Sequence, residues 1–284
     1  MTELVAYLVA GIALGSSFAL IGSGIVVVHR VTRVVNFAQG SIAVVGGMAS
    51  ASLLSGRLPH GLGELVAVLL SGLVGLVIGV LAIGRRGTPP LISLIITLGA
   101  SMLISAGIIW LWGQDPVSPP GLGGSVTILG ASVERQRLLV LGATLVAFAA
   151  LGLFFSRSYV GKALTASASN PWAARMVGID VRRMGLLAFG LAGVLGGLAG
   201  VLLAPTNAVS FYSDLPLALS GFAAAVFGGL TSPVRTLLGG IGLGVAGSLT
   251  AGYLNGSYQT EVALLLMLLI MIVRSNSFSA EEAK

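Results

Sequence analysis

The chain has 284 residues, of which 56% are hydrophobic and only 8% charged, and its mean hydropathy is +1.03. A soluble domain carries about 25% charged residues, so this composition excludes an ordinary soluble protein. The formal net charge is +6, and in a membrane protein its distribution among the loops matters more than its total, so no nucleic-acid partner is expected. Cysteine is absent, which excludes a disulfide framework and thiol chemistry.

Nine apolar segments follow one another along the chain, and several exceed the roughly 18 residues that cross a bilayer. Backbone groups in lipid must pair within their own segment, so each segment is predicted to be helical. The runs lack period-two alternation, which argues against a barrel. The sequence therefore predicts an all-α, polytopic transmembrane bundle of eight to nine apolar segments in a single domain, residues 1–284. The segments span residues 5–28, 34–55, 64–83, 91–112, 138–155, 184–204, 217–230, 236–254 and 259–273.

The basic residues indicate how the bundle is oriented. If all nine segments cross and the N-terminus lies outside, twelve of the fifteen basic residues face inward. Only Arg57, Arg135 and Arg137 then lie outside, as the positive-inside rule favours. The seventh segment is short. If it is re-entrant, nine basic residues face inward and six face outward. The N-terminus has no positive flank before its apolar run, so it is interpreted as a retained span.

Two of the loops between the segments are long. Residues 113–137 are predicted to lie outside, with rigid Pro/Gly turns followed by a small hairpin around Val126 and Ile128. Residues 156–183 are basic and are predicted to lie inside.

The inner loop contains strong helix boundary signals. Asn170 is a good N-cap, and Pro171 is favoured at the first helical position. Residues 172–177 can form about two turns, and Gly178 can end them in the left-handed conformation. Asp180 can then cap the next span. Such a helix is either a well-defined connector or a docking element for a cytoplasmic partner.

The loop, from Gly161 to Asp180, resembles the cytoplasmic loop of branched-chain amino acid permeases of the LivH type. That family has an Ala-rich run, then Asn/Asp-Pro, then Ala-Ala-Arg-x-x-Gly-Ile. In importers of the ATP-binding cassette (ABC) class, this loop supplies the coupling helix that docks on the ATPase. The resemblance thus implies an ABC importer permease fold. It implies that the coupling residues are Asn170, Pro171, Trp172, Ala173, Ala174, Arg175 and Gly178.

Two further stretches resemble the same family. Residues 34–41 read Val-Val-Asn-Phe-Ala-Gln-Gly-Ser, where the family typically has Asn-Phe-Ala-His-Gly-Glu. Gln39 and Ser41 therefore replace the usual His and Glu, so a titrating pair is not expected here. Residues 227–240 resemble the family's Gly-Gly-x-x-Ser-x-x-Gly pattern.

Polar residues within the apolar segments are the candidates for the substrate path. Ser93, Thr97 and Ser101 are spaced by four and share one helix face, which Ser105 extends. Buried polar groups in lipid are costly and face the bundle interior, so they either line a path or bond between helices. No charged residue is predicted deep in a span, except Glu261 near one end. The predicted path residues are Asn36, Gln39, Ser41, Ser93, Thr97 and Ser101.

Several chemical motifs are excluded. Gly161-Lys162 lacks the other residues of a phosphate-binding loop, so any ATPase must be a separate protein and no cofactor is expected in this chain. Gly242-x-Gly244-x-x-Gly247 lies within an apolar span, where helix packing is the better interpretation. His29 and His60 are too isolated for a metal site. No set of catalytic groups is found within the spans, so an intramembrane enzyme is not expected.

The resemblance implies a permease subunit, itself not an enzyme, that imports branched-chain or related amino acids across the bacterial inner membrane. It implies two cytoplasmic ATPase subunits that bind ATP-Mg, an extracytoplasmic binding protein, and a second permease of the LivM type or a second copy. One alternative keeps this machinery but transports urea, short amides or other small solutes. Another is an ATP-independent channel or secondary carrier.

Overall fold

The computed structural model describes residues 2–56, 58–83, 89–128, 130–254 and 256–258, with residues 262, 265–266 and 268–269. Six helices of this part are long and apolar enough to cross a membrane, which confirms the predicted polytopic helical bundle. The ninth apolar segment, 259–273, lies mostly outside the described residues. The elements in chain order are α1 (Thr2–Thr32), α2 (Gln39–Ser55), α3 (Leu62–Ile83), α4 (Pro90–Trp112), β1 (Ser125–Ile128), β2 (Ala131–Glu134), α5 (Arg135–Arg157), α6 (Tyr159–Ser169), α7 (Pro171–Met176), α8 (Val181–Leu203), η1 (Phe211–Ser213), α9 (Asp214–Phe227), α10 (Pro233–Tyr253) and η2 (Gly256–Tyr258).

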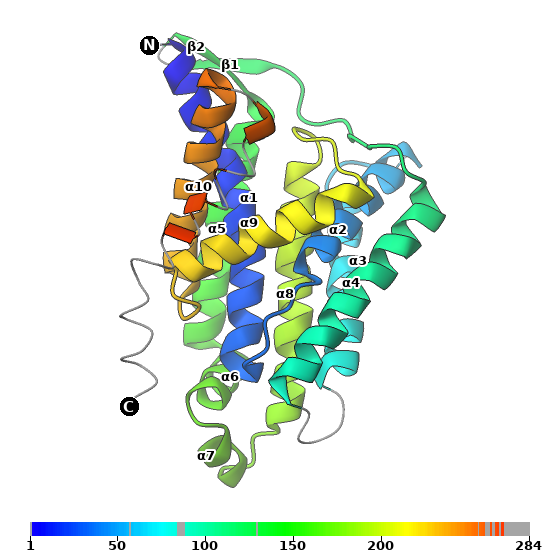
Figure 1. The fold of residues 1–284 in the computed structure, drawn as a ribbon, viewed down its shortest axis with the longest axis vertical. Helices are drawn as coiled ribbons and strands as arrows, with labels where there is room; N and C mark the ends of the chain where they lie inside the picture. The colour runs from blue at the N-terminus through cyan, green and yellow to red at the C-terminus, as the bar shows by residue number, and fades with distance from the viewer. Residues whose placement is uncertain are drawn as a thin grey trace.

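The bundle has two distinct ends (Figure 1). The first, which we call the hairpin end, holds the start of α1, the two strands and the end of α10. The second, which we call the α7 end, holds α6 and α7. The two long loops predicted from the sequence, 113–137 and 156–183, therefore lie at opposite ends of the bundle.

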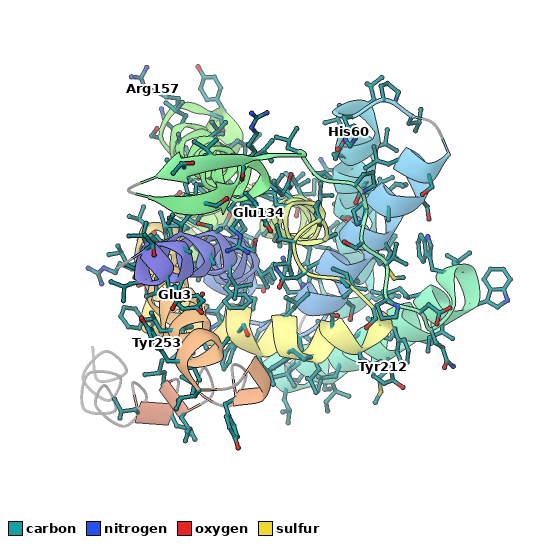
Figure 2. All side chains as sticks on the ribbon, turned by 90° about the horizontal axis from the view of Figure 1, so that it is seen from above. Glu3, His60, Glu134, Arg157, Tyr212 and Tyr253 are labelled. Atoms are coloured by element: carbon teal, nitrogen blue, oxygen red, sulfur yellow. The ribbon has the colours of Figure 1, made fainter. Side chains whose placement is uncertain are left out.

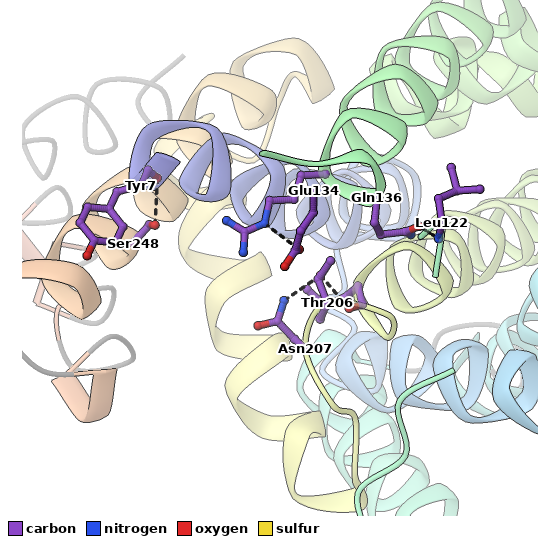
Figure 3. A network of polar contacts seen from close by, with 9 residues as sticks. Tyr7, Leu122, Glu134, Gln136, Thr206, Asn207 and Ser248 are labelled. Atoms are coloured by element: carbon purple, nitrogen blue, oxygen red, sulfur yellow. Dashed lines mark hydrogen bonds and ion pairs between the residues drawn. The ribbon is translucent and has the colours of Figure 1, made fainter. Parts of the chain in front are cut away.

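The hairpin predicted around Val126 is present. β1 and β2 pair antiparallel, with Val126 opposite Val133. Figure 3 shows how polar contacts tie this end together. The Gln136 side chain accepts a hydrogen bond from the Leu122 backbone at 3.0 Å, and the Ser248 hydroxyl of α10 donates to the Tyr7 carbonyl of α1 at 2.9 Å. The first bond holds the loop on the start of α5, and the second joins α10 to α1.

The second apolar segment is only partly helical. Residues 34–36 have no regular secondary structure and α2 begins at Gln39, five residues later than predicted. The Asn36 side chain accepts a hydrogen bond from the Ala38 backbone at 3.2 Å. Asn side chains compete with helical hydrogen bonding in this way, and the β-branched Val34 and Val35 favour extended backbone. As a result, α2 starts within the bundle and not at its edge.

The seventh segment lies obliquely. Figure 1 shows α9 crossing the bundle from the side of α2 and α4 to α10. The turn that follows contains Leu230 at a φ of 56°. From there α10 returns antiparallel to α1 toward the hairpin end, so successive segments keep alternating in direction.

Glycines allow backbones to touch along α1 and α10. A Cβ on Gly240 would lie 2.6 Å from the Gly15 carbonyl oxygen, and one on Gly11 would lie 2.6 Å from the Val245 Cα. Such distances are too short for any side chain, so this seam requires glycine. The helix-packing interpretation of the glycines at 242–247 is confirmed at Gly244, where a Cβ would collide with the backbone of Gly11 and Gly15.

Candidate functional site

The short helix in the basic loop has the predicted boundaries. The Asn170 side chain accepts hydrogen bonds from the Trp172 and Ala173 backbones at 3.1 and 3.0 Å, and Pro171 is the first helical residue. Gly178 has a φ of +84°. The Asp180 side chain caps α8 by accepting from Arg182 and Arg183 backbone groups. Local chemistry alone therefore defines both ends of α7.

The surface of α7 is apolar and exposed. Trp172 is 69% exposed, Met176 70% and Val177 75%, whereas Ala174 is buried. Only the exposure of Trp172 is apparent from the sequence as the mark of a docking helix; Met176 and Val177 extend the same patch. Exposed basic side chains surround it: Arg157, Lys162, Arg175, Arg182 and Arg183.

The loop is also firmly attached to the bundle. The Ile179 backbone, two residues before α8 begins, donates to the Ala174 carbonyl at 3.0 Å, which fixes the turn between α7 and α8. Ser158 caps α6 by accepting from the Gly161 backbone at 2.8 Å. Leu164 of α6 is buried in the main core. A displacement of α7 would therefore be transmitted to the spans.

Among the predicted path residues, Asn36 and Gln39 are fully buried. The Asn36 amide donates to the Gln39 amide oxygen at 3.2 Å, and the Gln39 amide donates to the Ala192 carbonyl, at the middle of α8, at 2.7 Å. A Cβ on Gly24 or Gly196 would collide with the Gln39 side chain. Gln39 thus bonds from α2 to α8, and Asn36 supports its amide from the segment before α2. Bonding between helices is the alternative to a path that the sequence left open.

The face of α4 that carries the regularly spaced polar residues turns toward α2. Ser93 and Thr97 are buried. The Thr97 hydroxyl lies 3.4 Å from both the Phe37 backbone nitrogen, which donates to it, and the Val35 carbonyl. The stretch before α2 is therefore held against α4 by polar contacts.

One turn further along, a second group of polar side chains comes together. The hydroxyls of Ser41 and Ser101 lie 2.7 Å apart. The Ser105 hydroxyl donates to a carboxylate oxygen of Asp214 at 2.6 Å, and the Ser41 hydroxyl donates to the same oxygen at 3.4 Å. We call Ser41, Ser101, Ser105 and Asp214 the Asp214 cluster.

The Asp214 cluster includes a carboxylate that the sequence places in a loop before residue 217. Asp214 is instead the first residue of α9, a 14-residue helix that is not among the six candidate spans of the described residues, so the expectation about charges deep in a span stays a prediction. The backbone at Asp214 packs on Gly40, at the second residue of α2. Ser105 lies seven residues before Trp112, the end of α4, or about 10 Å along the helix. Glu261 lies outside the described residues.

A helix start signal was available for Asp214. An acidic residue in the first turn, followed by proline, favours a helix beginning at residue 214 and not at 217. The position of that start within the bundle was not predictable, because it depends on contacts with Gly40 and Ser105, far away in sequence.

Two cavities open near the hairpin end. One of about 410 Å³ lies among α2, α3, α8 and the loop at Pro119 and Pro120, with His60 and Glu64 on its lining. The other, of about 260 Å³, lies between α1, α9 and α10 and includes Tyr212. Across the described residues, no three His, Asp or Glu side chains are grouped to hold a metal.

This fold occurs among solved structures. A chain of PsaBC from Streptococcus pneumoniae, in complex with Fab, superimposes with a TM-score of 0.56 at 15% sequence identity, over 95% of this chain and 91% of that one. At this identity the likeness shows the fold alone. The fold, with its six candidate spans, defines a multi-pass membrane protein.

The family is shown by sequence. The family model described as "Branched-chain amino acid transport system / permease component" matches residues 7–274, and the chain belongs to this family. The permease protein LivH of the high-affinity branched-chain amino acid transport system of Escherichia coli (strain K12) is 28% identical over 93% of this chain and 91% of its own length. The L-arabinose ABC transporter permease protein AraH of Azospirillum brasilense is 30% identical over 88% of this chain and 71% of its own length. The permease class expected from the sequence is confirmed.

Proposed function

We propose that this chain is one permease subunit of an ATP-driven importer for branched-chain or related amino acids in the bacterial inner membrane. The observation that carries the proposal is the family match over residues 7–274. The LivH relative, with 28% identity over nearly the whole chain, supports the cargo class.

The partners follow from the same assignment. Two ATPase subunits, which bind ATP-Mg, dock at the α7 end, and a second permease, of the LivM type or a second copy, completes the pore. A binding protein delivers cargo at the opposite, hairpin end. The abundance of exposed basic residues around α7 supports a cytoplasmic location for that end.

The coupling step uses α7. Trp172, Met176 and Val177 form an exposed apolar patch suited to a groove on the ATPase, where an aromatic anchor supplies much of the binding energy. ATP binding draws the two ATPases together and moves both α7 helices. Because the short turn between α7 and α8 is fixed by the bond from Ile179 to Ala174, and α7 lies next to α6, the spans follow, and the cavity switches from one side of the membrane to the other.

A second candidate cargo is a neutral solute. AraH is named for L-arabinose and matches this chain at 30% identity, so the same machinery serves more than one cargo class. Sugars have no ammonium group, so the role of Asp214 distinguishes the two candidates.

Reconstitution tests the proposed function. The permease, its second permease, two ATPases and binding protein are placed in proteoliposomes, and uptake of labelled leucine is measured with and without ATP. We expect uptake that requires ATP and the binding protein. Uptake by the permease alone would identify a channel or carrier, and uptake of arabinose but not leucine would identify the second cargo class.

A further inference from the structure

Asp214 is a half-buried carboxylate at the start of α9, where it meets α2 and α4, and the coupling mechanism above does not use it. We propose that Asp214, with Ser41 and Ser105, is the subsite that holds the ammonium group of the cargo during passage. The proposal rests on the proposed function, because it assigns a place to one group of an amino acid cargo.

The charge of Asp214 has no basic partner in the described part of the chain. The three ion pairs there join His60 to Glu64, Arg137 to Glu134, and Arg183 to Asp180, all near the ends of spans. Ionisable residues within membrane segments are costly, and they mark substrate or ion pathways by default. A half-buried carboxylate held between three helices without a cation therefore indicates that its cation arrives from elsewhere.

The hydrogen bonds of the cluster suit an ammonium ion. An ammonium group has three donors and no acceptor, so it needs several oxygen acceptors in one place. Asp214 provides two carboxylate oxygens, one of which accepts from the Leu215 backbone. The hydroxyls of Ser41 and Ser105 donate to the other and keep lone pairs free for a further donor. A hydroxyl-supported carboxylate can thus take the place of the water shell around the cation.

The cluster is accessible from one side of the bundle. Asp214 is half-buried, and it begins α9 next to α4. Figure 2, seen along the bundle, shows α9 running along that side from α10 to α4, with Tyr212 where the two helices meet. Three segments contribute to the cluster, α2, α4 and α9, so a shift of any one of them alters its geometry.

The loose attachment of α4 makes such a shift feasible. A Cβ added to Gly99 or Gly107 of this helix would meet no heavy atom within 4 Å, and Met102 and Leu103 on its outer face are more than 70% exposed. Since Ser105 belongs to α4, movement of this helix would separate its hydroxyl from Asp214. Cargo binding and release would then follow the position of α4.

The isosteric variant Asp214→Asn removes the charge and keeps one acceptor oxygen, which can accept from Ser105 while the bond from the Leu215 backbone is lost. In the full reconstituted complex with leucine-loaded binding protein, we expect leucine uptake to fall about tenfold or more, since a charged hydrogen bond is lost. ATP hydrolysis stimulated by the loaded binding protein should stay near the wild-type rate. Asp115→Asn, in the exposed loop after α4, is the matched control and should leave both rates unchanged.

The other possible outcomes would contradict the proposal of an ammonium subsite at Asp214. Wild-type uptake by Asp214→Asn would show that the charge is not needed, and a parallel loss of uptake and hydrolysis would give Asp214 a general conformational role. If Asp214→Asn does not assemble, Ser105→Ala decides: reduced uptake with normal hydrolysis supports the subsite, and unchanged uptake rejects it. Failure of the proposed function is separate, because the wild-type complex would then not import leucine at all.

Discussion

The two ends of the bundle differ in how completely they are packed. At the hairpin end, the strands, the loop around Leu122 and the tips of α1 and α10 are joined by hydrogen bonds within this chain. At the α7 end, a six-residue helix carries Trp172, Met176 and Val177 into solvent. A short helix cannot form on its own, so its caps and its attachment to α6 and α8 hold it in place. This contrast is the reason for proposing that an ATPase docks at the α7 end.

Cysteine labelling tests the contrast between the ends in an all-or-none way. The chain has no cysteine, and Ser169 and Ser125 are exposed at the α7 end and the hairpin end. An impermeant maleimide applied to intact spheroplasts should label Ser125→Cys and not Ser169→Cys, because charged reagents do not cross the bilayer. After permeabilisation both should react. Labelling of only position 169 in intact spheroplasts would reverse the orientation.

The glycine seam between α1 and α10, which runs between the two ends, should be the region of the bundle least tolerant of added side-chain volume. Gly240→Ala places a methyl group against the Gly15 carbonyl, whereas Gly242→Ala, in the same helix, meets no atom within 4 Å. Both gain the same helix propensity, so their difference isolates overpacking, which costs about 1–3 kcal/mol. Thermal unfolding in detergent should show a lower midpoint for Gly240→Ala. Equal midpoints would mean that α1 and α10 are not held in contact.

Substitution of Gly178, at the C-terminal end of α7, should have a smaller effect on stability and a specific effect on coupling. Gly178→Val puts a β-branched residue at a φ of +84°, which costs about 1–2 kcal/mol and turns the end of α7 away. Uptake per ATP hydrolysed should fall. Gly113→Val is the control, since Gly113 has a φ of +81° at the opposite end. A similar loss in both variants would attribute the effect to backbone strain in general.

The start of α7 should show the smallest effect. Asn170→Ala removes the bonds to the Trp172 and Ala173 backbones and should destabilise α7 by about 1 kcal/mol. Asn170→Asp keeps an accepting oxygen and should behave as wild type. Hydrogen exchange of residues 171–177 measures this directly. Equal protection in Asn170→Ala and Asn170→Asp would show that the cap does not hold the helix.

The features that could be predicted from the sequence are those that depend on interactions between residues close together in the chain. The boundaries of α7 depend on neighbours within four residues, and Asn170, Pro171 and Gly178 were sufficient to place them. The hairpin at Val126 follows from local patterns as well, and the late start of α2 has a local cause in the Asn36 side chain. The pairing of α1 with α10 along the glycine seam and the position of Asp214 depend on contacts between residues 60 or more positions apart, such as Gly15 with Gly240 and Ser105 with Asp214. No periodicity in the sequence encodes those pairings.

The coupling of this permease to an ATPase through the exposed patch on α7 is tested most sharply by Trp172→Ala. Trp110→Ala is the matched control, because Trp110 is 83% exposed on α4, away from α7. We predict that Trp172→Ala weakens ATPase binding by about 2 kcal/mol or more and lowers both cargo-stimulated hydrolysis and uptake, while membrane insertion stays normal. Trp110→Ala should keep its ATPase affinity. If Trp172→Ala binds the ATPase and transports like the wild type, α7 is a connector and coupling occurs elsewhere.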